Sequence, residues 1–208
     1  MISIVNYGVG NLGSIANMLS YIGVESQIIS SAEEILASDK LILPGVGAFA
    51  NAMKELNARG FIDPLNEAVL DKKTPVLGIC LGMQLLCDGS EEGQAEGLGL
   101  GWIKGVAKKF DFSGLDHKRR IPHMGWKEVT VAKEGKLYSE NETELQRYYF
   151  VHSYHMVCED EADVAATAVY GYSFTAAVEK GHIFGAQFHP EKSHRFGMKV
   201  LENFSKVA

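Results

Sequence analysis

Short apolar runs alternate with helix-spaced apolar positions along the first half of the chain. Apolar runs of strand length lie at residues 2–7, 24–29, 40–43 and 76–79. Between the first two, apolar side chains recur at the spacing of one helical face: Leu12, Ile15, Leu19 and Ile22. Helices are also predicted at about residues 48–59 and 64–72. Because parallel strands need crossover helices, this alternation predicts a parallel sheet that is covered on both faces.

The second half of the chain has strand-like segments without helices between them. They lie at residues 126–131, 148–152, 164–170, 175–180 and 182–188. A closing helix is predicted at about residues 195–207. We therefore expect a doubly wound, flavodoxin-like three-layer α/β fold, with a central mixed, mainly parallel sheet and antiparallel additions in the C-terminal half. No repeat or linker divides the sequence, which predicts one domain over residues 1–208.

The composition argues against several classes of protein. With 46% hydrophobic and 22% charged residues, the chain is typical of a globular rather than a disordered protein. A net charge of −6 argues against nucleic acid as a partner, and the basic run Lys118-Arg119-Arg120 is interpreted as a solvated loop. No apolar stretch approaches the roughly 20 residues of a membrane span. Three cysteines without paired spacing and an N-terminus without signal-peptide features predict a cytoplasmic protein.

A cysteine stands in the strongest local motif of the sequence. Gly78-Ile79-Cys80-Leu81-Gly82 follows a buried strand and precedes an apolar helical segment, so it is the G-x-C-x-G form of a nucleophile elbow. The flanking glycines permit the tight turn, and the turn brings the sulfur next to backbone N–H groups at the start of a helix. The motif predicts Cys80 as a nucleophile. The alternative is a buried cysteine in a tight turn.

A base and a carboxylate follow the last predicted strand. In Phe188-His189-Pro190-Glu191, the proline sets a turn that places Glu191 where it accepts a hydrogen bond from the His189 imidazole. Cys80 and His189 both stand at the carboxyl ends of predicted strands, where open α/β sheets place their sites. We therefore expect Cys80, His189 and Glu191 to form a catalytic triad. The alternative is a surface turn.

Two glycines follow a third predicted strand, in Leu43-Pro44-Gly45-Val46-Gly47. A glycine-containing loop beside the nucleophile allows a backbone amide to point toward a developing oxyanion. We expect Gly45, Val46 or Gly47 to supply such a donor, together with the backbone N–H of Leu81. The alternative is an ordinary β–α loop.

Other motifs are weaker candidates. Gly8-Val9-Gly10-Asn11-Leu12-Gly13 fits a dinucleotide fingerprint, but the second strand ends in Ile28-Ile29-Ser30-Ser31, without the acidic residue that holds the ribose. No cofactor is therefore expected. His123, His152 and His155 form no metal-binding pattern with the cysteines, so no metal is expected either. The remaining cysteines and three methionines are predicted to pack in the core: Cys87, Cys158, Met83, Met124 and Met156.

Three of these segments, in this order, resemble the class I glutamine amidotransferases: residues 44–47, 78–84 and 188–191. The resemblance implies that the Cys80 thiolate attacks the side-chain amide of L-glutamine. His189 protonates the departing ammonia, and a glutamyl thioester forms on the sulfur. Water activated by His189 then releases glutamate.

Four segments resemble more closely one branch of this family, the glutaminase subunits of imidazole glycerol phosphate synthases. These segments are residues 7–12, 122–126, 150–154 and 190–193. The resemblance implies that Gln84 and Glu92 hold the glutamine, with Glu92 at its α-ammonium group. Backbone groups near Ser153 and Tyr154 are expected to help.

The same resemblance implies a partner. In this branch, ammonia passes to a (β/α)8 barrel cyclase subunit (HisF-type), which makes imidazole glycerol phosphate and aminoimidazole carboxamide ribonucleotide in histidine biosynthesis. No segment of this chain could form such a barrel, so a heterodimer with a separate chain is expected. Four residues match the interface of the family: Asn11, His123, Trp126 and Lys192.

Two positions depart from the family pattern. Lys127 stands where asparagine is common, and His155 follows Ser153-Tyr154 where a different residue is common. These differences leave open a paralogue that supplies ammonia to amidino-sugar synthesis on surface polysaccharides through a similar barrel. Two other hypotheses are a stand-alone thiol hydrolase, acting on peptides or γ-glutamyl compounds, and a binding subunit that has lost catalysis.

Overall fold

A mixed β-sheet forms the centre of the computed structural model, which describes residues 1–95, 98–116, 119–138 and 145–208. Its strands are β1 (Ile2–Val5), β2 (Ser26–Ile29), β3 (Lys40–Leu43), β4 (Val76–Ile79), β7 (His123–Val131), β8 (Gln146–His152), β10 (Val164–Tyr170), β11 (Tyr172–Lys180) and β12 (Ile183–Ala186). Their order is β2-β1-β3-β4-β12-β11-β10-β7-β8. The pairs from β2 to β12 are parallel, and the pairs from β12 to β8 are antiparallel. The parallel part has the strand order of flavodoxin, so the predicted fold class is confirmed.

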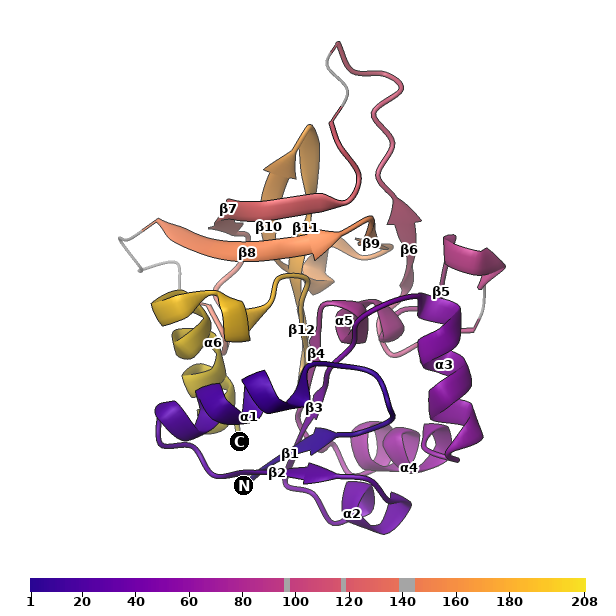
Figure 1. Cartoon of the computed structure of the whole chain (residues 1–208), viewed down its shortest axis with the longest axis vertical. Helices are drawn as coiled ribbons and strands as arrows, with labels where there is room; N and C mark the ends of the chain where they lie inside the picture. Colours follow the sequence, from indigo (N-terminus) through magenta and orange to yellow (C-terminus); the bar gives the residue numbers. More distant parts are fainter. Residues whose placement is uncertain (96–97, 117–118, 139–144) are drawn as a thin grey trace.

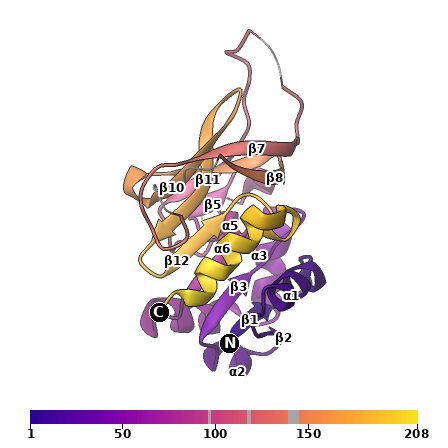
Figure 2. The same ribbon diagram turned by 90° about the vertical axis from the view of Figure 1, so that its left-hand side faces the viewer.

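Helices cover both faces of the parallel part of the sheet. On one face lie α1 (Leu12–Tyr21) and α6 (His194–Lys206), in front of the strands in Figure 2. On the other face lie α2 (Ala32–Leu36), α3 (Phe49–Ala58), α4 (Ile62–Asn66) and α5 (Leu81–Leu85). A π-helical turn, Glu67–Asp71, follows α4 directly. Short α2 was not predicted, although Ser31 and Glu34 form a capping box at its start.

The direction of β12 corrects one expectation. Residues 182–188 were predicted to be an antiparallel addition. β12 instead forms a hairpin with β11 around Gly181 and lies between β11 and β4, antiparallel to the first and parallel to the second. The carboxyl end of β12 therefore lies at the same sheet edge as those of β3 and β4, with Ile79 opposite Ala186 in the register.

A second, small sheet was not predicted. It consists of β5 (Gly89–Ser90), β6 (Gly105–Lys109) and β9 (Tyr154–Cys158), in the order β5-β6-β9. Only Ser153 separates β8 of the main sheet from β9 of the small sheet. The chain thus changes sheets at a single residue, which Figure 1 shows where β8 meets β9.

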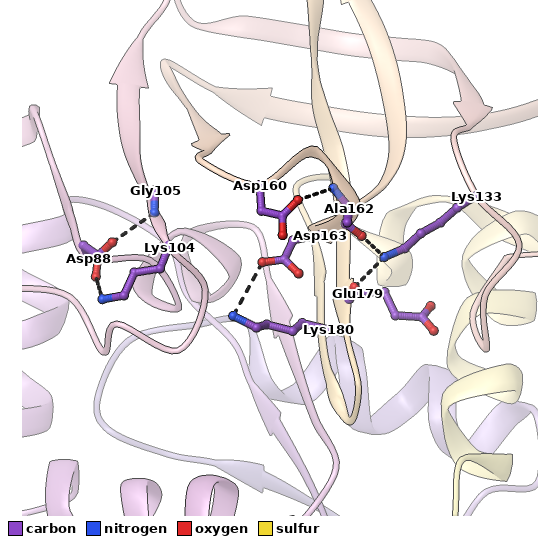
Figure 3. Close-up of polar contacts among 9 residues, drawn as sticks. All are labelled: Asp88, Lys104, Gly105, Lys133, Asp160, Ala162, Asp163, Glu179 and Lys180. Atoms are coloured by element: carbon purple, nitrogen blue, oxygen red, sulfur yellow. Dashed lines mark hydrogen bonds and ion pairs between the residues drawn. The ribbon is translucent and has the colours of Figure 1, made fainter.

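Polar contacts fasten the loops below the small sheet (Figure 3). Asp88 accepts hydrogen bonds from the Lys104 Nζ at 2.7 Å and from the Gly105 N–H at 3.0 Å. Lys180 lies 3.7 Å from the carboxylate of Asp163. The lysines of both pairs are exposed to solvent. Surface ion pairs are worth about 0–1 kcal/mol, so these pairs fix loop positions rather than supply most of the stability.

Several smaller expectations also have outcomes. Met83 and Met156 are buried as predicted, but Met124 is 63% exposed, because it points away from the core on β7. Arg119 and Arg120 are exposed, whereas Lys118 lies outside the described residues. Within the described ranges, no helix has the length and apolar character needed to cross a membrane.

Candidate active site

Cys80 lies in a strained turn between β4 and α5. Its backbone has φ 55° and ψ −109°, a left-handed conformation that costs a residue with a side chain about 1–3 kcal/mol. Neighbouring structure holds it there: the Cys80 N–H donates to the carbonyl of Ala186 at 2.7 Å, and the Cys80 carbonyl accepts from the Met83 N–H at 3.1 Å. The backbone therefore fixes where the sulfur points.

The glycines around Cys80 serve close packing. A Cβ on Gly82 would collide with the backbone carbonyl of Leu43, and a Cβ on Gly78 would lie 2.6 Å from the Gly82 carbonyl oxygen. The elbow is thus packed directly against the end of β3 and the loop that follows it. No side chain fits between them.

His189 and Glu191 form a buried pair next to this turn. The His189 Nδ1 lies 2.8 Å from Glu191 Oε1, and their side chains are 3% and 1% exposed. Among the described residues, Glu191 Oε2 has no hydrogen-bond partner, so the carboxylate is hydrogen-bonded through Oε1, to the His189 ring. The turn itself is pinned by Ser193, whose hydroxyl donates to the His189 carbonyl at 2.6 Å and accepts from the Tyr149 N–H at 3.0 Å.

Both Cys80 and Glu191 affect the pKa of the His189 imidazole. Burial by itself lowers the pKa of His189, but hydrogen bonding to Cys80 and then to Glu191 outweighs burial and raises the pKa from 6.5 to about 9. The protonated imidazole is therefore the favoured form at neutral pH. A cysteine sulfur, an imidazole and a carboxylate in this sequence of contacts are the parts of a nucleophile, base and orienting group.

Replacing Glu191 with glutamine should lower the pKa of His189. The amide keeps the size of the side chain but removes its negative charge. In the wild type, the raised pKa stabilises the fold fully below about pH 6.5, and this contribution is lost as the pH rises through about 9. The variant should lose less stability over this interval. NMR titration of His189 and urea unfolding at several pH values measure both effects.

The exposed Glu128→Gln variant is the control for this prediction, since Glu128 lies on the outer part of β7. It should leave the titration of His189 unchanged. An unaltered His189 pKa in Glu191→Gln would mean that the carboxylate does not set the charge of the imidazole.

A pocket of about 260 Å³ lies beside Cys80 and brings most of the predicted site residues together. Cys80, Leu81 and His189 line it, as do Val46 and Gly47. All four predicted glutamine-binding residues line it too: Gln84, Glu92, Ser153 and Tyr154. A larger cavity of about 890 Å³, lined by Phe110, Phe112 and Tyr172, contains none of the three residues predicted to form the triad.

The loop after β3 is held close to the elbow. Gly45 does not line the pocket, because it packs against α5: a Cβ there would lie 2.7 Å from the Gly82 nitrogen. Gly47 has φ 90°, and Val46 is 44% exposed. The buried Tyr7 hydroxyl donates to the Pro44 carbonyl at 2.5 Å. The Leu81 N–H stands at the very start of α5, where no preceding helical turn offers it a carbonyl.

The glycine-rich loop after β1 supports this arrangement. Gly10 has φ 131°, and a Cβ on it would lie 3.1 Å from the side chain of Pro44. The loop therefore packs against the segment at residues 44–47. This contact explains the need for glycine there without a dinucleotide.

Glu92 is anchored at the start of a helix. Its Oε2 accepts a hydrogen bond from the Phe49 N–H, in the first turn of α3, at 2.8 Å. Burial and then the negative charge of Glu92 raise the pKa of Tyr154. One oxygen of Glu92 is thus fixed by the protein, and Glu92 lines the pocket.

Sequence reasoning missed several residues of this site. Gln187 is fully buried, and its Nε2 lies 3.9 Å from the Cys80 sulfur. It was not predicted because it lies inside a strand-like run. A polar glutamine two residues before His189 could nevertheless have indicated it. The Val151 carbonyl lies 3.9 Å from the same sulfur. His152 and Pro122 also line the pocket.

The residues predicted at a partner interface do not all lie on the surface. Asn11, Trp126 and Lys192 are exposed. The Trp126 ring stacks on His194 at 5.4 Å, and Lys192 lies over Tyr149. His123, in contrast, is 0% exposed. Its expected place at the interface is therefore corrected: it points into the core from the opposite face of β7.

The other cysteines differ from Cys80. Burial raises the pKa of Cys87 to about 11 and that of Cys158 to about 12, so both remain protonated and poorly nucleophilic. Cys87 is buried as predicted, whereas Cys158 is half-buried. In the part of the chain that the structure describes, no group of three or more His, Cys, Asp and Glu side chains could hold a metal ion.

Comparison with known proteins assigns the family. The family model of glutamine amidotransferase class-I matches residues 3–207. A solved structure described as a glutamine amidotransferase superposes with a TM-score of 0.75 and 19% identity, over 100% of both chains, and so shares the fold. The chain belongs to the class-I glutamine amidotransferase family.

Two curated relatives show to which group within the family the chain belongs. The chain is 51% identical to imidazole glycerol phosphate synthase subunit HisH 2 of Methanococcus maripaludis, over 100% of both chains. It is 46% identical to imidazole glycerol phosphate synthase subunit HisH of Leptospira interrogans, again over 100% of both. Within the family, it therefore belongs with the HisH subunits.

Proposed function

We propose that this protein hydrolyses glutamine to glutamate and ammonia and delivers the ammonia to a synthase subunit. The observation that carries the proposal is one pocket lined by Cys80, His189, Gln84 and Glu92, with Glu191 hydrogen-bonded behind the imidazole. Nucleophile, base and binding groups for an amino acid thus surround the same space. Family membership and the names of the HisH relatives support the same substrate.

In the proposed reaction, the Cys80 sulfur attacks the side-chain carbonyl carbon of glutamine. The carbonyl oxygen becomes an oxyanion, to which the Leu81 N–H and an amide of residues 45–47 donate. His189 transfers its proton to the amide nitrogen, the C–N bond breaks, and ammonia leaves a glutamyl thioester. His189, now neutral, accepts a proton from water as the water attacks the thioester. Glutamate leaves and the thiolate is restored.

The raised pKa of His189 suits this sequence. At neutral pH the group begins as an imidazolium, so the proton for the departing nitrogen is already in place. Glu191 keeps that proton-bearing ring in one orientation by accepting from Nδ1. The other ring nitrogen is left to serve the sulfur and the substrate.

The pocket suits a free amino acid. Pockets for drug-sized ligands measure about 300–1,000 Å³, and this one is smaller, at about 260 Å³. Glu92 offers an anion for the α-ammonium group of the substrate. Its anchoring to the Phe49 N–H means that little side-chain freedom remains to be lost on binding.

Replacing Glu92 with glutamine should raise the KM for glutamine about 10- to 100-fold, because a hydrogen bond to a charged group is worth about 1.5–3 kcal/mol. The value of kcat should change less, since Glu92 is expected to contact the α-ammonium group and not the reacting amide. Steady-state glutamate release measures both constants.

Glu91→Gln is the matched control for Glu92→Gln. Glu91 is the preceding residue, is exposed, and accepts from the Lys109 N–H at 2.9 Å, but it does not line the pocket. It should leave KM nearly unchanged. Equal effects of the two substitutions would remove Glu92 from the substrate site.

We propose a heterodimer with a (β/α)8 barrel cyclase in the cytoplasm, where the barrel consumes the ammonia in histidine biosynthesis. The exposed side chains of Asn11, Trp126 and Lys192 offer contact points. Met124, at 63% exposed, adds apolar surface on the same face of β7 as Trp126. Val151 is paired with Met124, so this surface borders the pocket.

Glutamate release, assayed with and without the barrel subunit and its ligand, tests the proposed function. We expect weak hydrolysis by the chain alone and stimulation by the complex. Full activity without any partner would instead support a stand-alone thiol hydrolase. No hydrolysis under either condition would reject the glutaminase.

A paralogous role is the second candidate. The M. maripaludis relative has a numbered name, HisH 2, and Lys127 and His155 depart from the family pattern. A paralogue would feed amidino-sugar synthesis through a similar barrel. Stimulation by an amidino-sugar barrel, and none by the histidine-pathway barrel, would favour it.

A further inference from the structure

Buried polar side chains continue inward from the Cys80 sulfur. Gln187 Nε2 lies 3.9 Å from that sulfur, and Gln187 Oε1 accepts a hydrogen bond from Gln84 Nε2 at 3.0 Å. Gln84 Nε2 also donates to the carbonyl of Tyr154 at 2.9 Å. Gln187 is 0% and Gln84 4% exposed. Both amides are thus held by other protein groups and not by solvent.

Two histidines extend this chain of hydrogen bonds. His152 Nδ1 lies 2.7 Å from the Tyr154 carbonyl oxygen, the same oxygen to which Gln84 donates. His123 Nδ1 lies 3.1 Å from His152 Nε2. The side chains of His123 and His152 are 0% and 6% exposed. A continuous path therefore joins the Tyr154 carbonyl to a histidine on the inner face of β7.

The direction of each hydrogen bond follows from the groups involved. A carbonyl only accepts, so His152 carries its proton on Nδ1. Burial lowers the pKa of His152 to about 3 and that of His123 to about 4, which keeps both rings neutral. His152 Nε2 is then an acceptor, and His123 Nδ1 must be the donor. Each histidine thus has one defined tautomer.

Aromatic packing fixes the rings in these orientations. The His123 ring lies nearly parallel to Tyr170, with centroids 4.0 Å apart, and to Phe150, with centroids 5.3 Å apart. The His152 ring contacts Phe110 and Phe174, with centroids 5.1 and 5.2 Å away. These ring contacts, together with the hydrogen bonds, hold the two N–H groups in defined directions.

We propose that His152, with His123 behind it, is a positioning residue for glutamine binding: the two rings hold the Tyr154 carbonyl and thereby fix the wall of the pocket formed by Ser153 and Tyr154. The inference rests on the proposed glutaminase function.

The location of Tyr154 explains why such a hold is needed. The chain passes from the main sheet to the small sheet at Ser153, so the ladder of the main sheet ends at His152. Phe110 N–H donates to the Ser153 carbonyl at 3.1 Å, and Gln84 and His152 hold the next carbonyl. Without the His152 donor, the Gln84 bond is the one that the described side chains still make to the Tyr154 carbonyl, and the pocket wall is fixed less firmly.

Two substitutions at position 152 test whether the Nδ1–H donor, and not the imidazole ring as such, is needed. The asparagine amide nitrogen is attached to Cγ, as Nδ1 is in histidine, so His152→Asn retains a donor for Tyr154. The glutamine amide nitrogen is one bond further out, near the position of Nε2, so His152→Gln loses that donor. The same pair at position 123 tests the outer histidine, since only His123→Asn retains a donor to His152.

Labelling of Cys80 by a diazoketone analogue of glutamine, followed by mass spectrometry, measures the half-saturating concentration and the limiting rate separately. His152→Gln should raise the half-saturating concentration about tenfold, as expected for a lost buried hydrogen bond. Its limiting rate should stay within about twofold of the wild type, and His152→Asn should stay within about twofold in both constants. At position 123, the glutamine variant should likewise have a higher half-saturating concentration than the asparagine variant, with smaller changes than at position 152.

The outcomes separate the inference from the proposed function. If the wild type fails to label at Cys80 and to release glutamate, the proposed function is wrong. If the wild type labels but the asparagine and glutamine variants at position 152 bind the analogue equally well, the inference is wrong. An effect confined to the limiting rate would also overturn it. If a position-152 variant does not fold, as judged by its melting temperature, the position-123 pair decides by the same criterion.

Discussion

Replacing Cys80 with alanine should reduce glutamate release by at least about 10³-fold, even in the complex with the barrel subunit. In the proposed reaction the sulfur forms the thioester, and no other described residue that lines the pocket is a comparable nucleophile. Alanine retains the Cβ, so the strained turn at φ 55° is not made worse. The fold should therefore persist. Steady-state glutamate release and a melting curve measure the two effects.

Cys158→Ala is the control for this prediction. Cys158 is half-buried on β9, and its pKa is raised to about 12, so it should not act as a nucleophile. Activity should remain near the wild-type value. Retention of stimulated activity by Cys80→Ala would show that the thioester mechanism is wrong for this protein.

Replacing Gly82 with alanine should destabilise the protein by about 3 kcal/mol, at the upper end of the usual cost of overpacking. The new Cβ would collide with the Leu43 carbonyl, and it would also approach the Pro44 carbonyl carbon to 3.2 Å. Because both neighbours are backbone, a rotamer change cannot relieve the clash. We expect a melting temperature about 6–12 °C lower and a loss of glutaminase activity, since the loop at residues 44–47 must move away from Leu81.

Gly13→Ala is the matched control. Gly13 lies in α1, and nothing stands within 4 Å of a Cβ placed there. Alanine also favours the helix over glycine. The melting temperature should therefore stay within about 3 °C of the wild type or rise. A Gly82→Ala protein as stable and active as Gly13→Ala would contradict the close packing of the elbow against β3.

The parts of the site that could be predicted are those encoded in short motifs at strand ends. The elbow at Cys80 and the turn at His189-Pro190-Glu191 each require a few neighbouring residues with particular backbone and chemistry. Their meeting across 109 positions followed from one rule, that parallel strands end at a common edge. The register of Ile79 with Ala186 agrees with that reasoning.

The parts that could not be predicted depend on contacts distant in sequence. Gln84 and Gln187 are 103 positions apart, and no local spacing reveals that one amide bonds to the other. The passage from β8 to β9 occurs within one residue, without a proline or glycine to mark it. His123 stands in a segment that resembles an interface, and only the alternation of β7 shows that its side chain points inward.

The main sheet and the small sheet carry different residues of the pocket. Cys80 and His189 follow strands of the main sheet, whereas Glu92 and Tyr154 follow or begin strands of the small one. The proposed reacting groups and two of the expected glutamine contacts are therefore carried by different sheets, while Gln84 lies on α5, close to Cys80. Substitutions around Glu92 and Tyr154 should therefore alter the fit of the amino acid without moving the strands that hold Cys80 and His189.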